Sequence, residues 1–234
     1  MKQHILIITG LAATLFACEA KDLGNELPDA QVQSDASNCV PGRIIYINGV
    51  GGNYIPGADN DPVTNTSSII SQPATLLAYA GKLSTIVSCV AAGMADFNVT
   101  ITTTDPGDVD HHEVVLTDSP ASAFGIGAGV DGISPFTCMD HARMLNFAFT
   151  PGNDATTVCV RALWLIGTAT NLSHVVDCNG PMTGQEYCGD NSPSFLDEDT
   201  ACGQGDPQNC QCTGLATQNP YQHLLATFGA ACTN

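Results

Sequence analysis

The chain contains few basic residues, few aromatic residues and no long apolar run. Only six of its 234 residues are Lys or Arg, against 23 Asp or Glu, and the net charge is −17. Because phosphate binding needs clustered Lys and Arg, this balance argues against a nucleic-acid partner. No apolar run reaches the roughly 18 residues that a transmembrane helix requires. The low charged fraction (12%) and aromatic fraction (6%) favour a loop-rich extracellular protein, whose acidic charge keeps it soluble.

The N-terminal residues have the order of a short exported signal segment, residues 1–18. Lys2 precedes an apolar core that runs from Ile5 to Phe16. The sequence Leu-Phe-Ala-Cys that ends at Cys18 resembles the lipobox of bacterial lipoproteins, which implies that Cys18 carries a lipid anchor. Residues 19–38 are polar and are expected to form a flexible tether. We therefore expect a protein of the bacterial cell envelope, anchored or secreted, with a single ordered domain over residues 39–234.

The eleven cysteines are an odd number, which an exported protein must account for. Assigning Cys18 to the lipid leaves ten, enough for five disulfides in an oxidising compartment. Their pairing cannot be derived from the sequence, and the spacing of Cys210 and Cys212 would also suit a metal site, although disulfides are favoured. The ten are Cys39, Cys89, Cys138, Cys159, Cys178, Cys188, Cys202, Cys210, Cys212 and Cys232.

The hydrophobic patterns predict an α+β domain with a mixed, twisted sheet and two long helices. Strands are expected at 44–47, 98–104, 113–116 and 145–149, with a glycine-rich crossing over 125–132. One helix is indicated by helically spaced apolar residues from Leu83 to Met94. A second helix is capped by Asp154 and should end at Asn171, because Asn readily adopts the left-handed conformation. A late helix is expected over 220–228, within a cysteine-rich C-terminal region.

The segment from Trp164 to Met182 carries the most specific motif. Laid on the pattern H-E-x-x-H-x-x-G-x-x-H followed by a methionine turn, its last histidine is His174 and its methionine is Met182. Asn171 stands at the turn position. Together with the order of strands and helices, this segment resembles the catalytic domain of the metzincin superfamily, which includes matrixin-like and astacin-like zinc endopeptidases. The resemblance covers nearly everything from Arg43 to Phe228.

The same alignment shows which parts of the zinc site are missing. In the motif, two histidines one helical turn apart grip the metal and a glutamate polarises the water. Here Trp164 and Thr168 stand at the histidine positions, and Leu165 replaces the glutamate. The resemblance therefore implies a protein without catalytic residues, in which His174 is a vestigial ligand and no cofactor is expected. We expect a binding or structural role, with a peptide or protein recognised in the former substrate cleft or by the surface loops.

The alternative is a metallopeptidase with a rebuilt zinc site. Its ligands would be His174, His141 and either His111 or His112, because neighbours on a strand point to opposite sides. Exposed, hydrogen-bonded histidines are the favoured interpretation for the latter three, and His223 is expected on the surface of the late helix.

Three acidic clusters could hold calcium, which prefers six to eight oxygen ligands from such loops. None has the EF-hand spacing, so solvated turn residues are the favoured interpretation. The clusters are Asp59-Asn60-Asp61, then Asp105 with Asp108 and Asp110, and Asp197-Glu198-Asp199.

Overall fold

A five-stranded sheet forms the centre of the computed structural model, which describes residues 40–183 and 192–232. These residues belong to one unit of the chain, Ala36–Asn234. The expected signal segment (1–18) and tether (19–38), together with Cys18, Cys39 and Cys188, lie outside the described residues. No helix in the described ranges is long and apolar enough to cross a membrane.

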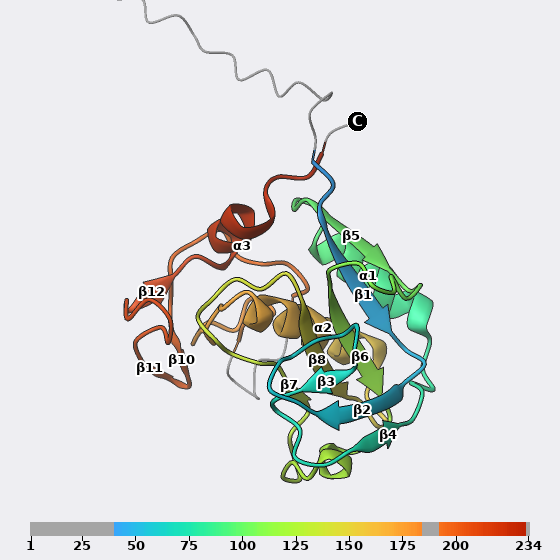
Figure 1. Cartoon of the computed structure of the whole chain (residues 1–234). Helices are drawn as coiled ribbons and strands as arrows, with labels where there is room; N and C mark the ends of the chain where they lie inside the picture. Colours follow the sequence, from blue (N-terminus) through green and yellow to red (C-terminus); the bar gives the residue numbers. More distant parts are fainter. Residues whose placement is uncertain (1–39, 184–191, 233–234) are drawn as a thin grey trace, which may run out of the picture. The chain divides into compact units, whose positions relative to one another are not determined.

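The sheet has the strand order β5-β1-β6-β8-β7 (Figure 1). Strands β5 (Val99–Thr102), β1 (Arg43–Asn48), β6 (His111–Thr117) and β8 (Met144–Phe149) run parallel, and β7 (Gly132–Ile133) pairs antiparallel with β8 at the edge. Every residue of β6 and β8 is buried, as expected for strands covered on both faces. The mixed sheet and the helices around it confirm the α+β class.

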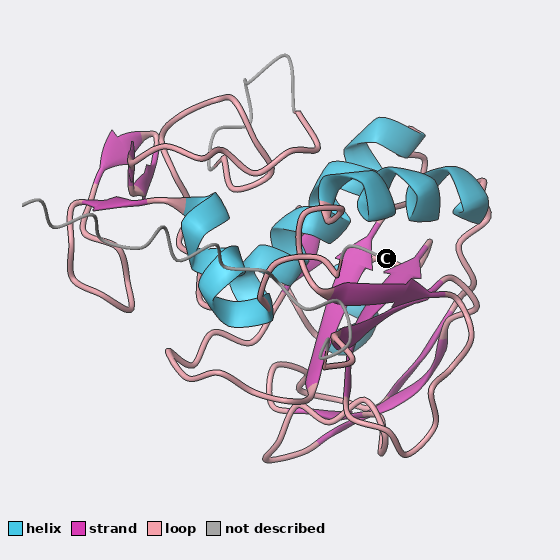
Figure 2. Cartoon of the chain, turned by 90° about the horizontal axis from the view of Figure 1, so that it is seen from above, coloured by secondary structure: helices cyan, strands magenta, loops and turns pink. Residues whose placement is uncertain are grey.

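Helices α1 (Leu83–Gly93) and α2 (Ala155–Ala169) cover one face of the sheet (Figure 2). Because successive side chains on a strand point to opposite faces, Val114 and Leu116 pack with the helices, whereas Val115 packs on the other face. The disulfide Cys89–Cys159 joins the two helices.

A smaller sheet of strands β3 (Thr66–Ser67), β2 (Gly52–Pro56) and β4 (Ala74–Leu76) belongs to the second hydrophobic cluster, with the short helix η2 (Ala121–Phe124). Its centre is an aromatic group in which Phe147 of β8 packs edge-on against Tyr54 and Phe124, with ring centroids 5.1 and 4.8 Å away. The sequence patterns did not predict these three strands, which are only two to five residues long.

Helix α2 begins and ends where its capping residues predicted. The carboxylate of Asp154 accepts bonds from the backbone N–H groups of Thr156 (2.9 Å) and Thr157 (3.1 Å). Asn171 adopts φ +73°, and the next residue, Leu172, donates its N–H to the Gly167 carbonyl at 3.0 Å. This is a Schellman turn, so the chain leaves the helix sharply at the residue that the sequence indicated.

The C-terminal region consists of short strands and one helix. Strands β9 (Thr200–Ala201) and β12 (Thr217–Gln218) pair with each other, as do β10 (Gly203–Gln204) and β11 (Asp206–Pro207), and α3 spans Pro220–Phe228. Besides the bond between the helices, disulfides join Cys138 to Cys212 and Cys202 to Cys210, while Cys178 and Cys232 are also disulfide-bonded. The expectation of disulfides is therefore confirmed for the cysteines within 40–183 and 192–232.

Two strand boundaries differ from the sequence-based expectation. Strand β5 stops at Thr102, and Thr102 Oγ1 accepts a bond from the N–H of Thr104 (3.0 Å), which turns the chain early. Strand β6 begins at His111, two residues before the expected start, because His111 and His112 pair with Ile44 and Ile45 of β1. Both histidines are therefore part of the buried sheet.

Candidate functional site

The candidate site lies where the second half of α2 meets strand β7 and the segment after the Schellman turn. The ring of Trp164 stacks on the ring of His174, with centroids 5.3 Å apart and an interplanar angle of 28°. A Cβ added at Gly132 of β7 would lie only 3.1 Å from Cζ3 of Trp164. The indole is therefore held between the edge strand and the histidine, and two positions of the aligned motif meet in space.

The other aligned positions have different surroundings. Thr168 lies one helical turn after Trp164, on the same face of α2. Leu165 is fully buried within the hydrophobic core, in a position where no ionised group would be tolerated without a partner. The glutamate position of the motif is thus a core residue of this protein.

Met182 is buried beneath α2. Its carbonyl accepts a bond from the N–H of Val175 at 2.9 Å, and its Sδ contacts the place that a Cβ on Gly167 would occupy. Only glycine lets the methionine approach the helix this closely. The methionine therefore packs against the turn of α2 that precedes Thr168.

Four polar atoms of the site are buried and have no hydrogen-bond partner in the part of the chain that the structure describes. They belong to Trp164 (Nε1), Thr168 (Oγ1), Asn171 (Oδ1) and His174 (Nδ1). Only two other side-chain atoms within the described ranges share this condition, Nε2 of His111 and Nδ1 of His112. Burial lowers the pKa of His174 below its usual value, although the backbone of Thr183 acts in the opposite direction, so the imidazole is neutral at neutral pH.

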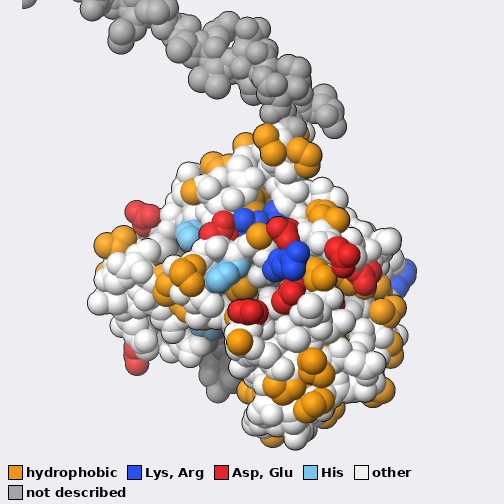
Figure 3. Space-filling view, viewed as in Figure 1, with side chains coloured by type: hydrophobic (Ala, Val, Ile, Leu, Met, Phe, Trp, Pro, Cys, Tyr) orange, Lys and Arg blue, Asp and Glu red, His pale blue; other side chains and the backbone are white. Residues whose placement is uncertain are grey.

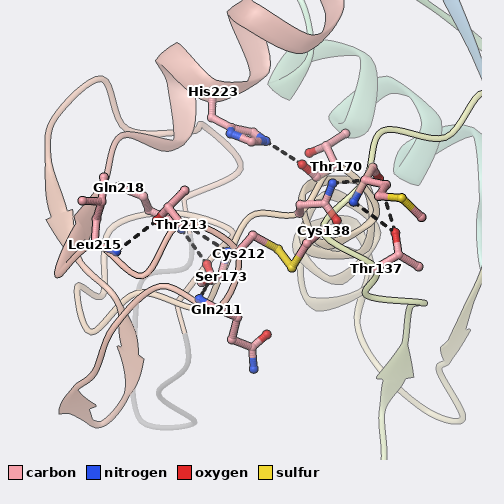
Figure 4. The surroundings of a disulfide bond; sticks show 12 residues. Thr137, Cys138, Thr170, Ser173, Gln211, Cys212, Thr213, Leu215, Gln218 and His223 are labelled. Carbon is pink, nitrogen blue, oxygen red and sulfur yellow. Dashed lines mark hydrogen bonds between the residues drawn. A yellow bond between two sulfur atoms is a disulfide. The ribbon is translucent and has the colours of Figure 1, made fainter.

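The C-terminal region holds the segment after α2 in place (Figure 4). Ser173 donates its N–H to Oε1 of Gln218 (3.0 Å), and its hydroxyl accepts from the N–H of Gln211 (2.9 Å). The adjacent disulfide Cys138–Cys212 attaches the loop before β8 to the same region. These bonds fix the backbone path that carries His174 to Trp164.

Asn171 and His223 reinforce this arrangement. The amide of Asn171 donates from Nδ2 to the carbonyl of Met139 at 2.9 Å. His223 of α3 donates from Nε2 to the carbonyl of Thr170 at 2.5 Å. His223, which was expected on the surface of the late helix, is half-buried and braces the end of α2 through this bond.

The expectation of exposed histidines is wrong for His111 and His112, which are 1% and 0% exposed. Their rings lie on opposite faces of β6: Nδ1 of His111 donates to the Val109 carbonyl (2.7 Å), and Nε2 of His112 donates to the His141 carbonyl (2.9 Å). Burial lowers the pKa of His112 to about 4. His141 is half-buried and contacts Thr137 through Nε2 (2.8 Å).

The histidines proposed for a rebuilt zinc site are not gathered as a ligand set. Within residues 40–183 and 192–232, no three His, Cys, Asp or Glu side chains form a group that could hold a metal ion. His174, the one aligned ligand, has an aromatic ring as its neighbour instead of a second histidine.

The acidic clusters use carboxylates for turns and ion pairs. Arg143 donates to Asp110 (2.6 Å) and contacts Asp61 (3.4 Å). Figure 3 shows basic side chains next to acidic ones on the face of the molecule that it displays. Asp105 accepts from the N–H of Gly107 (2.8 Å), and Asp197 accepts from two amide side chains near the start of α3. These contacts fit the interpretation of the clusters as turn residues.

Sequence reasoning missed a buried carboxylate on the opposite face of the sheet. Glu113 is 3% exposed, and its Oε1 accepts bonds from Nδ2 of Asn48 (2.8 Å) and the hydroxyl of Tyr54 (3.1 Å). Burial raises the pKa of Glu113 to about 7, against the effect of both bonds. The available signal was its position in β6, where it shares a face with the buried Val115.

Comparison with protein-family models, with curated proteins and with solved structures gave no match for this chain. The arrangement of its own residues is therefore what indicates its function.

Proposed function

We propose that this protein is an exported, metzincin-like domain that has lost peptidase chemistry and binds a peptide or protein segment beside α2. The observation that carries the proposal is the stack of Trp164 on His174. In the aligned motif, Trp164 and His174 stand at the first and third ligand positions, which would meet at one metal. The contact between these two residues supports the proposal that the backbone follows the path of the motif while the side chains differ from it.

The donor set of the site supports a non-catalytic role. A catalytic zinc needs three protein ligands with available lone pairs. Indole nitrogen is a donor only, and a threonine hydroxyl is not among the usual ligands. Leu165 cannot take a proton from water and lies in the core. Of the residues at the three aligned ligand positions, only His174 is a usual zinc ligand.

The edge strand supports peptide binding. Among the residues that the structure describes, strand β7 pairs only with β8 and is the last strand of the sheet. An extended peptide can add to such an edge through main-chain bonds, while neighbouring pockets read its side chains. Trp164 lies directly against Gly132 of this strand, and tryptophan is enriched among residues that dominate binding energy.

The proposal is tested with the purified mature protein and a displayed library of extended peptides. Selected peptides should bind the native chain and lose about tenfold or more in affinity to Trp164→Ala, the change expected when a central aromatic is truncated. Leu215→Ala, at an exposed residue of the C-terminal region, serves as a control that should retain binding. Failure to select any binder, or equal binding by Trp164→Ala, would contradict the proposal.

Metal analysis tests the loss of catalysis separately. The expected result is well below one zinc per chain by mass spectrometry and no cleavage of a casein-like substrate. One zinc per chain that disappears in His174→Ala, together with proteolysis blocked by chelators, would establish a rebuilt metallopeptidase instead.

The proposed location follows from the disulfides and the N-terminal sequence. The disulfides of the described domain indicate an oxidising environment, outside the cytosol. We propose in addition that Cys18 is lipidated. Cys18→Ser should release the protein from the membrane fraction, and an unmodified Cys18 in the intact protein by mass spectrometry would refute the anchor.

A further inference from the structure

The four unpaired atoms of the candidate site define what its ligand must offer. In this uncharged group, Trp164 Nε1 can only donate, Asn171 Oδ1 can only accept, and Thr168 Oγ1 can do both. The fourth, Nδ1 of His174, belongs to a half-buried ring. Leaving a buried polar atom unpaired costs stability, so a ligand that pairs with several of them gains affinity.

The four atoms belong to residues that are neighbours at the end of α2. Trp164, Thr168 and Asn171 follow each other at helical spacing along the end of α2, and His174 stacks on the first of them. The orientation of the Asn171 amide is settled, because its Nδ2 donates to a carbonyl (2.9 Å) and so leaves Oδ1 without a donor. Thr168 is 9% exposed, and its hydroxyl does not bond to a preceding helix carbonyl.

The surface is also electrically neutral. The nearest basic residue along the helix, Arg161, is already paired with Asp131 at 2.9 Å. The lowered pKa of His174 keeps its ring uncharged at neutral pH. A carboxylate, a phosphate or an ammonium group would find no countercharge among these residues, whereas a neutral group with both an N–H and a carbonyl would be complemented.

We propose that the surface formed by Trp164, Thr168, Asn171 and His174 binds a neutral amide group, either of a peptide backbone or of a carboxamide side chain. This inference rests on the proposed function and specifies the chemistry recognised by the same site. The four atoms have no exposed area, so the amide enters as the stacked rings separate. Both rings are partly exposed, so this contact lies at the edge of the domain and not in its core.

The single tryptophan of the chain gives a residue-specific measurement. The indole N–H of Trp164 has its own resonance in a ¹⁵N–¹H spectrum of the full mature protein, and Trp164→Phe assigns it. The probes are N-acetylglycine N-methylamide and its diester analogue, methyl acetoxyacetate, in which oxygen replaces both N–H groups. The amide should shift the indole resonance in a saturable manner, and the diester should bind about tenfold more weakly for each hydrogen bond lost.

Two isosteric variants separate recognition from general effects on α2. Thr168→Val should weaken amide binding by about tenfold, the value of one hydrogen bond. Thr156→Val makes the same change at an exposed position of α2 and should leave binding unchanged. The spectrum of each variant also reports whether it is folded.

Each outcome bears on the inference. Equal shifts with the amide and the diester would mean apolar contact alone and would overturn it. No shift with either would mean that internal water or protein atoms satisfy the site, and would overturn it as well. Selected peptides that depend on Trp164 but not on Thr168 would leave the proposed function standing without the amide site. An amide-specific shift with no selected peptide would reject the proposed function and retain the amide site.

Discussion

Glu113 makes the stability of the fold depend on pH in a direction unusual for a carboxylate. Its folded pKa of about 7 exceeds the ordinary value of 4.5, so the folded chain holds the proton more tightly than the unfolded chain. Below pH 4.5 both states are protonated and the group contributes no pH dependence. Between pH 4.5 and about 7 the unfolded chain releases this proton while the folded chain keeps it, so stability falls over this range, and the loss is complete once the buried residue ionises above pH 7. With about 1.4 kcal/mol per pKa unit, the full loss is about 3 kcal/mol.

The perturbation is Glu113→Gln, which keeps a neutral side chain of the same shape at every pH. The carboxamide oxygen still accepts from Asn48 and Tyr54. Relative to the native chain, the variant should therefore gain about 3 kcal/mol in free energy of unfolding between pH 4.5 and pH 8. Burial is the main cause of this difference, because both hydrogen bonds act to lower the pKa of Glu113.

The assay is urea unfolding with intact disulfides, followed by Trp164 fluorescence at half-unit intervals from pH 4.5 to 8. Only the difference between native chain and variant is interpreted, since other groups titrate in both. Glu198→Gln removes one carboxylate at an exposed position and serves as the matched control for the change of charge. A constant difference for Glu113→Gln, or one in which the native chain gains stability as pH rises, would refute the reasoning.

Three further predictions concern the residues and disulfides that support the fold, and the same unfolding measurement tests them. Gly167→Ala should destabilise the fold, because its clash with Met182 costs about 1–3 kcal/mol and exceeds a helix-propensity gain of about 1 kcal/mol. Asn171→Ala should be about 1 kcal/mol less stable than Asn171→Gly, since both lose the side chain and only alanine is strained at φ +73°; equal stabilities would contradict this. Removing Cys89–Cys159, which spans 70 residues, should lower the free energy of unfolding by about 4 kcal/mol, because a longer loop loses more entropy when it is closed. Removing Cys202–Cys210, which spans 8 residues, should lower it by about 2.5 kcal/mol. The reverse order would contradict this dependence on loop length.

The elements with strong periodicity or clear end signals could be predicted from the sequence. Asp154 and Asn171 marked the two ends of α2 because capping and left-handed turns are local properties of these residues. The short strands β2 to β4 could not be predicted, since two to five residues give too little alternation. Their positions are set by packing against the aromatic cluster around Tyr54.

The site shows the same division between local and tertiary information. The spacing from His174 to Met182 predicted a turn near α2, and the alignment with the metzincin motif put Trp164 at a ligand position. The stacking of Trp164 on His174 depends on bonds to the C-terminal region, such as the two between Ser173 and Gln218, which no local pattern contains. The burial of His111 was missed because a charged loop precedes it and the strand begins earlier than its apolar residues suggest.

The consecutive residues His112 and Glu113 have a joint consequence for the acid behaviour of strand β6. His112 has a folded pKa of about 4 against an ordinary 6.5, so it weakens the fold as pH falls below 6.5, whereas Glu113 weakens it as pH rises above 4.5. Between these values the two opposite slopes offset each other, although the residues lie on opposite faces of the sheet. The free energy of unfolding can therefore change little with pH between these values. A nearly flat profile would still contain two large ionisation effects of opposite sign, one from each residue.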